Sequence, residues 1–91
     1  MARVRLPERC EVACVTQLCD ELRAAVLTGE VVIDASEVTA IDAVGAQLLC
    51  AAAAALRAQD RRLAWEASSP ALRDAIGVLG LGAAVELPAE T

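Results

Sequence analysis

Apolar and polar residues follow two spacings along the chain, and these predict strands and helices in alternation. Residues 3–6 alternate polar and apolar side chains, as a half-exposed strand does, and the β-branched run at residues 31–33 is typical of a buried strand. Between them, apolar side chains recur at helical spacing from about residue 13 to residue 27, with Gly29 just past the end. The connector at residues 8–12 has room for another short strand. The first third of the chain therefore predicts a strand, a helix and a second strand.

The middle and later parts of the chain continue this order. An alanine-rich segment predicts a helix at residues 43–58, with Asp42 at its N-cap, where a carboxylate accepts hydrogen bonds from the free amides of the first turn. Residues 63–67 predict a third strand, and Ser69-Pro70 is a helix start signal. The expected buried positions are Val44, Leu48, Ala52 and Leu56 in the first of these helices and Leu72, Ile76 and Leu79 in the second.

The last apolar run, at residues 81–87, predicts one short final strand before a polar tail at residues 88–91. The whole order of strands and helices predicts the α/β class, with a small mixed or parallel β-sheet and helices packed against it. We expect a single domain at residues 1–91, because this length is usual for one domain and the sequence has neither an internal repeat nor a linker.

Composition narrows the classes of partner. The chain has a net charge of −5, no lysine, and Trp65 as its one aromatic residue, which we expect in the core. Nucleic-acid binders carry basic clusters and stacking aromatic side chains, so we expect no nucleic-acid partner. The longest apolar stretch, at residues 43–56, is shorter than the roughly 20 residues that a bilayer span requires, and the N-terminus lacks the apolar segment of a signal peptide. We expect a cytoplasmic protein that does not insert into a membrane.

Titratable side chains give little support to catalysis. The sequence has no histidine, lysine or tyrosine, which removes most general bases and covalent nucleophiles. Asp34 and Asp42 flank one loop, and we interpret them as a strand-end cap and a helix cap in preference to an acid/base pair. The four cysteines form no Cys-x-x-Cys pair and are interpreted as reduced thiols. Gly45 lacks the surrounding glycines and the lysine of a phosphate-binding loop. We therefore expect no catalytic residue, no metal and no cofactor.

The stretch VVIDASEVTAIDAVGAQLL, at residues 31–49, resembles the signature of STAS domains, the fold shared by bacterial anti-sigma-factor antagonists and the cytosolic tails of sulfate transporters. The family pattern is an apolar strand, Asp-Leu-Ser, a hydrophobic loop, then Asp-Ser-(Ser/Ala)-Gly-Leu and further aliphatic residues. The positions that match it are Asp34, Ser36, Val38, Ile41, Asp42, Gly45, Leu48 and Leu49. The segment SSPALRDAIGVLGL resembles the third helix of the family. The resemblance covers most of the chain, and its N-terminal strand region is shortened.

The resemblance implies a protein-binding surface at residues 39–47. In the antagonists, the residue after the capping aspartate is a serine or threonine that a partner kinase phosphorylates, and the phosphate disrupts binding. That position is Ala43 here, which has no hydroxyl. The resemblance then implies either constitutive binding or a branch of the family that works as a subunit without phosphorylation. We expect Asp34 and Ser36 to structure the loop, and Thr39 is the alternative phosphosite.

The expected partner-binding residues surround the predicted helix start. They are Val38, Thr39, Ile41, Asp42, Ala43, Val44, Gly45 and Gln47. For some of these residues the sequence leaves two roles open. Val38 and Ile41 form an apolar docking patch if exposed and hold the loop if buried, Val44 belongs either to the surface or to the core, and Gly45 allows close packing either within the protein or with a partner.

Three functions fit the sequence. The first is a non-catalytic regulatory module that resembles anti-sigma-factor antagonists and docks on a kinase-like anti-sigma factor or another ATPase. The second is a STAS subunit of an ABC lipid-transport complex that supports its ATPase. The third is a sensor of a small molecule, a lipid or a nucleotide, although the missing glycine loop argues against a nucleotide. A homodimer through the sheet edge left by the shortened N-terminus is a further alternative.

Overall fold

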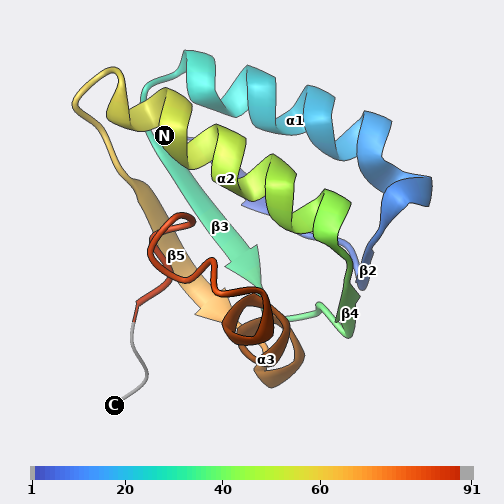
Figure 1. Cartoon of the computed structure of the whole chain (residues 1–91). Coiled ribbons are helices and arrows are strands. Elements are labelled where there is room, and N and C mark those ends of the chain that lie inside the picture. The colour runs from blue at the N-terminus through green and yellow to red at the C-terminus, as the bar shows by residue number, and fades with distance from the viewer. Residues whose placement is uncertain (1, 89–91) are drawn as a thin grey trace.

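Three parallel strands form the main sheet of the structure, a computed structural model that describes residues 2–88. They are β1 (Ala2–Arg5), β3 (Val31–Ala35) and β5 (Leu63–Ser68), in the order β1-β3-β5. Ala2 pairs with Val31, and Val31 pairs with Leu63, so the apolar strand β3 lies at the centre (Figure 1). The α/β class with a parallel sheet is confirmed.

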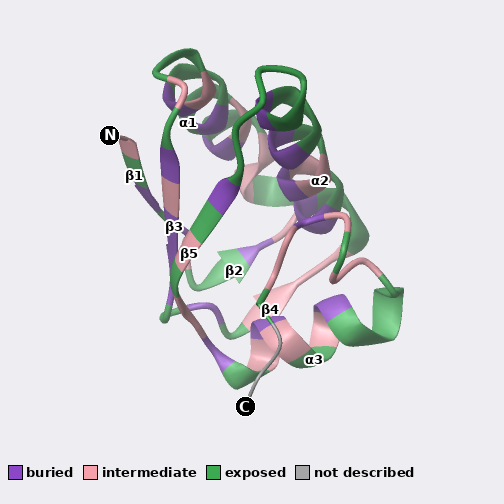
Figure 2. Ribbon diagram, turned by 90° about the vertical axis from the view of Figure 1, so that its left-hand side faces the viewer, coloured by how far each residue is buried: buried purple, intermediate pink, exposed green. Residues whose placement is uncertain are grey.

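Two helices cover one face of this sheet. A short 3₁₀ turn, η1 (Val12–Cys14), leads into α1 (Val15–Leu27), and α2 (Ala43–Arg57) lies beside α1 and runs in the same direction (Figure 1). Figure 2 shows both helices on the same side of the sheet, and β1 and β5 each contain exposed positions. The helices predicted at residues 13–27 and 43–58 are confirmed. Within residues 2–88, no helix has the length and apolar character needed to cross a membrane.

The core between the sheet and the helices consists mainly of aliphatic side chains. Leu6, Ile33 and Leu49 are fully buried. Trp65 lies in the third strand of the sheet, as predicted, but it is only partly buried and packs against the buried cluster from outside it. Of the buried positions predicted in α2, Ala52 and Leu56 are confirmed and Leu48 is half-buried. The buried residues of α2 are Gly45, Ala46, Leu49, Ala52, Ala53 and Leu56. Val44, expected at the start of the buried stripe, is 40% exposed. In an alanine-rich helix several faces are apolar, so the packing against the sheet decides which one is buried.

A second, smaller sheet joins the connector after β1 to the loop before α2. Its strands are β2 (Arg9–Cys10) and β4 (Ala40–Ile41), which run parallel, with Arg9 opposite Ala40. The short strand foreseen within residues 8–12 is confirmed, whereas β4 lies in a segment that the sequence predicts as loop. The loop is also fixed by the Thr39 N–H, which donates to the Glu8 carbonyl at 2.7 Å.

The third helix, α3 (Pro70–Leu79), begins as its sequence predicts. Ser69 is the N-cap and accepts a hydrogen bond from the Leu72 N–H at 3.1 Å. Gly80 ends the helix in the left-handed conformation, at φ 70°. Leu72 and Ile76 are buried as predicted, but Leu79 is 42% exposed, so its assignment to the core was wrong. The helix packs beside β4, away from the main helical layer (Figure 1), and its last turn extends past the core.

The final strand predicted at residues 81–87 was wrong. This segment forms successive turns, in which the Val85 N–H donates to the Leu81 carbonyl at 3.0 Å. It still contacts β5, because the Glu86 carboxylate accepts from the Leu63 N–H at 2.8 Å and the Val85 carbonyl accepts from the Trp65 ring N–H at 3.0 Å. A side chain thus pairs one backbone N–H of β5 that a further strand would pair. Of the predicted polar tail at residues 88–91, only Pro88 lies within the described residues.

Candidate functional site

Asp42 fixes the start of α2 and joins it to the N-terminal part of the chain. Its Oδ1 accepts from the Gly45 N–H at 2.9 Å, which confirms the predicted N-cap, and its Oδ2 accepts from the Val12 N–H at 3.0 Å. Hydrogen bonds to a carboxylate favour its charged form. The Gly45 N–H above all, followed by the Val12 N–H, therefore holds the pKa of Asp42 below its ordinary value.

Gly45 is buried against the backbone of β2. A Cβ at this position would overlap the carbonyl oxygen of Cys10 and lie 3.1 Å from Ile41 Cγ1. Of the two roles expected for Gly45, close packing within the protein is the one observed. Cys10 itself is buried, and this burial raises the pKa of its thiol to about 11, with smaller contributions from Cys14 and Asp42. At neutral pH the Cys10 thiol is therefore protonated and is a poor nucleophile.

Asp34 and Ser36 hold the loop that follows β3. The Ser36 hydroxyl donates to Asp34 Oδ1 at 2.7 Å, the Ser36 N–H donates to the same oxygen at 3.1 Å, and Arg3 lies 3.4 Å from Oδ2. These contacts, the Ser36 hydroxyl first, lower the pKa of Asp34. The loop hydrogen bond expected of Ser36 is confirmed. Among residues 2–88, Asp34 and Asp42 have no hydrogen-bond partner in common, and each caps its own element.

The hydrophobic residues of the loop take different positions. Val38 is 2% exposed, and its carbonyl accepts from the Ser69 hydroxyl at 2.6 Å, so it holds the loop and its side chain is not open to a partner. Ile41 is half-buried. Thr39 is exposed, and its hydroxyl donates to the Glu8 carbonyl at 3.0 Å. The docking patch expected from Val38 and Ile41 is therefore reduced to the exposed part of Ile41.

The exposed part of this loop lines a groove that is shared with α3. The groove has a volume of about 490 Å³. Its lining residues are Thr39, Ala40, Ile41 and Ala43 on one side and Ala71, Asp74, Ala75, Val78 and Leu79 of α3 on the other. Val78 is 88% exposed, which makes it one of the most exposed large apolar side chains of the described residues. Asp74 is the one charged residue of the lining. We call this surface the α2–α3 groove.

Some of the predicted partner-binding residues line the α2–α3 groove, and others are exposed outside it. Thr39, Ile41 and Ala43 line the α2–α3 groove, whereas Val44 and Gln47 are exposed on α2 outside its lining. The sequence prediction missed the contribution of α3. The available signal was Val78, an apolar residue that lies off the helical stripe of Leu72 and Ile76.

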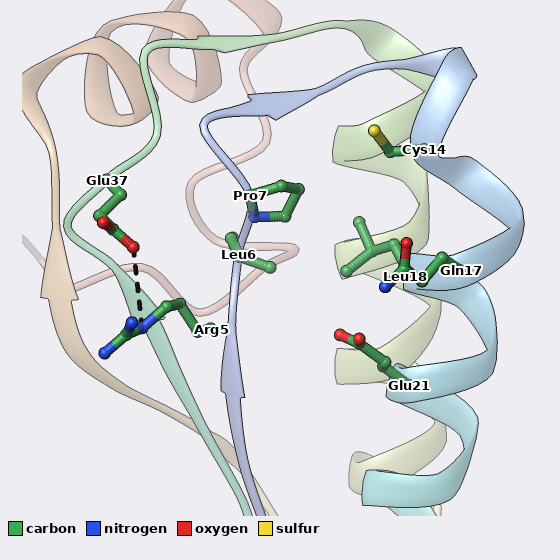
Figure 3. A pocket seen from close by; sticks show the side chains of 8 residues that line it. All are labelled: Arg5, Leu6, Pro7, Cys14, Gln17, Leu18, Glu21 and Glu37. Carbon is green, nitrogen blue, oxygen red and sulfur yellow. Dashed lines mark ion pairs between the residues drawn. The ribbon is translucent and has the colours of Figure 1, made fainter.

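A smaller cavity between the end of β1 and α1 has more charged groups (Figure 3). It measures about 170 Å³, and its Arg5 guanidinium lies 3.7 Å from the Glu37 carboxylate, while Glu21 of α1 lines the opposite side. This volume is below the roughly 300 Å³ of most small-molecule sites. Its titratable groups are an ion pair, a carboxylate of α1 and the Cys14 thiol, which together do not form a nucleophile and base. Within residues 2–88, no three histidine, cysteine, aspartate or glutamate side chains cluster as metal ligands.

Comparison with known proteins gives one match. The family model described as "Mlab, STAS domain" matches residues 2–87. No curated protein and no solved structure matches the sequence. STAS domains are in general non-catalytic regulatory modules that mediate protein–protein interactions. The family model spans all the strands and helices described above, including the Asp42 cap and the helix that it starts. The chain therefore belongs to the STAS domain family.

Proposed function

We propose that this protein is a regulatory binding module that docks on an ATPase through the α2–α3 groove. The observation that carries the proposal is the exposure of Ala43 at the first turn of α2, next to the apolar side chains of Val78 and Leu79. Contiguous exposed apolar surface marks interaction sites on soluble proteins. An alanine at the helix start also lets a partner approach the backbone closely.

The groove is held in place before any partner arrives. The Ala40 N–H and the Thr39 hydroxyl both donate to the Glu8 carbonyl, and the Asp42 N–H donates to the Cys10 carbonyl at 3.2 Å. Ordering a loop on binding reduces affinity, so a loop that is already fixed favours association. This rigidity supports a docking role for the loop.

The chemistry of the first helical turn supports constitutive docking. Ala43 has no hydroxyl to accept a phosphate, and the hydroxyls of Ser36 and Thr39 donate to Asp34 and to the Glu8 carbonyl. Two ATPase partners are proposed, a kinase-like anti-sigma factor and the ATPase of an ABC lipid-transport complex. The alanine at position 43 favours the second, because a permanent subunit needs no phosphate switch for its release.

The test is the variant Ala43→Glu, which places a negative charge where the antagonists carry their phosphate. A carboxylate at a helix N-terminus is compatible with the helix dipole, so the melting temperature should change little. We expect affinity for the ATPase to fall at least tenfold, measured by calorimetry on the partner recovered from host lysate. Ala54→Glu, at an exposed alanine of α2 outside the groove, is the matched control and should bind as the wild type does.

The identity of the recovered protein separates the two partners. A kinase-like ATPase bound by the wild type and lost in Ala43→Glu assigns the protein to a signalling circuit, and a transporter ATPase with the same behaviour assigns it to an ABC complex. If both baits recover the same proteins, or none, the α2–α3 groove is not the working surface. The small-molecule sensor is then the remaining hypothesis.

A further inference from the structure

A second groove lies between the two helices that cover the sheet. It measures about 430 Å³, within the range of small-molecule sites. It is lined by Cys19, Leu22 and Val26 of α1 and by Leu48, Ala51 and Ala55 of α2, which are three or four residues apart along each helix. Residues three and four apart lie on one face of a helix, so each helix contributes a single continuous face. We call this surface the α1–α2 groove, and it has no lining residue in common with the α2–α3 groove.

The α1–α2 groove is apolar except at one position. Leu22 is buried at its base, whereas Ala51 and Ala55 are exposed along one side and Leu27 is 87% exposed. Arg23 is the one charged residue of the lining. Among the ion pairs of residues 2–88, none includes Arg23. The groove thus combines a hydrocarbon-like surface with one unpaired cation.

We propose that the α1–α2 groove binds a long-chain carboxylate, with its hydrocarbon tail between α1 and α2 and its head group paired with Arg23. A guanidinium accepts a carboxylate through two parallel hydrogen bonds, which suits a single anionic head. From Cys19 to Leu27 the groove extends about 12 Å along α1 at 1.5 Å per residue, with Arg23 midway. Long helical side chains lean toward the N-terminus of their helix, so a head group paired with Arg23 lies toward Cys19 and the tail extends toward Leu27. An extended acyl chain covers about 15 Å, half of the ~30 Å hydrocarbon core of a bilayer. Most of one such chain therefore fits along the groove.

Charge and size argue against other occupants. A second copy of the chain would bring another Arg23 and no carboxylate from its own groove lining, so the cation would stay unpaired. A partner helix has a diameter of about 10–12 Å with its side chains, too wide for a groove of this volume to enclose. A single alkyl chain is the narrower occupant and matches both the apolar lining and the cation.

The first experiment measures binding of octanoate, decanoate and dodecanoate to the whole protein by calorimetry, below their micelle concentrations. Each methylene that enters the groove should tighten binding about fourfold. Arg23→Gln should weaken dodecanoate binding about tenfold and leave the binding of decanol unchanged. The matched control is Arg62→Gln, at an exposed arginine outside the groove that likewise forms no ion pair with any residue the structure describes, and it should bind as the wild type does.

A second variant tests the location without relying on charge. Ala51→Phe fills the groove from an exposed position, so the fold should be retained and dodecanoate binding lost. Affinity that does not depend on chain length, or that falls equally in both arginine variants, would overturn the proposal. Self-association that Ala51→Phe abolishes would assign the groove to a second copy instead. A partner protein lost with Ala51→Phe, in the absence of carboxylate binding, would equally overturn it.

Discussion

At Gly45, a single hydrogen atom in place of a side chain sets how closely α2 approaches β2. The Cys10 carbonyl occupies the space of a Cβ, and because it belongs to the backbone of β2 it cannot turn aside as the neighbouring Ile41 side chain could. We expect Gly45→Ala to destabilise the protein by about 1–3 kcal/mol through overpacking. This loss should appear although alanine favours a helix interior by about 1 kcal/mol. The free energy of unfolding in urea measures it.

Gly77 provides the matched control in α3. Nothing lies within 4 Å of a Cβ at this position, so only helix propensity should change. Gly77→Ala should therefore stabilise the protein by about 0.5–1 kcal/mol. Equal effects of the two substitutions would show that the approach of α2 to Cys10 does not limit the packing.

Residue roles that depend on local chemistry could be predicted from the sequence. Asp42 and Ser69 cap their helices as expected, because a cap involves only the residue itself and amides two or three positions ahead. Burial depends on distant parts of the chain and was predicted less well. Val44 and Leu79 are exposed where the spacing predicted core. Several faces of α2 are apolar and the packing against the sheet selects one, whereas the last turn of α3 extends past the core.

At the scale of elements, the start of α2 should make stability depend on pH. The pKa of Asp42 is lowered in the folded protein, so its contribution is complete above the ordinary carboxyl pKa of about 3.9 and is lost as the pH falls through the lower folded value. We expect the melting temperature of the wild type to fall below about pH 4. Asp42→Asn should melt lower at neutral pH and lose less on acidification. An equal loss in the variant would contradict this role for Asp42.

The start of α3 is tied to the loop before β4 by one hydroxyl. Ser69 caps α3 and also donates to the Val38 carbonyl, at a buried position. Ser69→Ala should cost about 1–2 kcal/mol of unfolding free energy, because it removes a cap and leaves a buried acceptor unpaired. Ser69→Thr keeps the hydroxyl and should retain most of that stability in the same denaturation experiment. A threonine variant as unstable as the alanine variant would assign the effect to packing.

Two elements show where prediction from the pattern ends. Strand β4 has two residues, and it forms because the segment finds β2 beside it, a partner about 30 positions earlier in the chain. Residues 81–87 have an apolar run typical of a strand but form turns, and the Glu86 side chain supplies the acceptor for the Leu63 N–H of β5. In both cases a contact with a distant residue decides the structure.

In the whole molecule, the candidate site was predicted in part. The loop and the start of α2 follow one another in the chain and carry the family signature, so residues 39–47 could be identified from the sequence alone. The other side of the α2–α3 groove comes from α3, about 30 residues later, and is brought there by β5. No local pattern links Asp74 or Val78 to Ala43. Only the fold places them along one groove.

The parallel order β1-β3-β5 also affects how the protein folds during its synthesis. Each pairing joins residues about 30 positions apart, as Ala2 with Val31 and Val31 with Leu63. A helix lies between the two paired strands in the chain each time. No hairpin is therefore available as an early, local contact, and loop closure precedes any gain from strand pairing. During synthesis on the ribosome, β3 has an open edge until β5 emerges. The most apolar strand of the main sheet therefore remains unpaired on one edge until the last strand of that sheet has been synthesised.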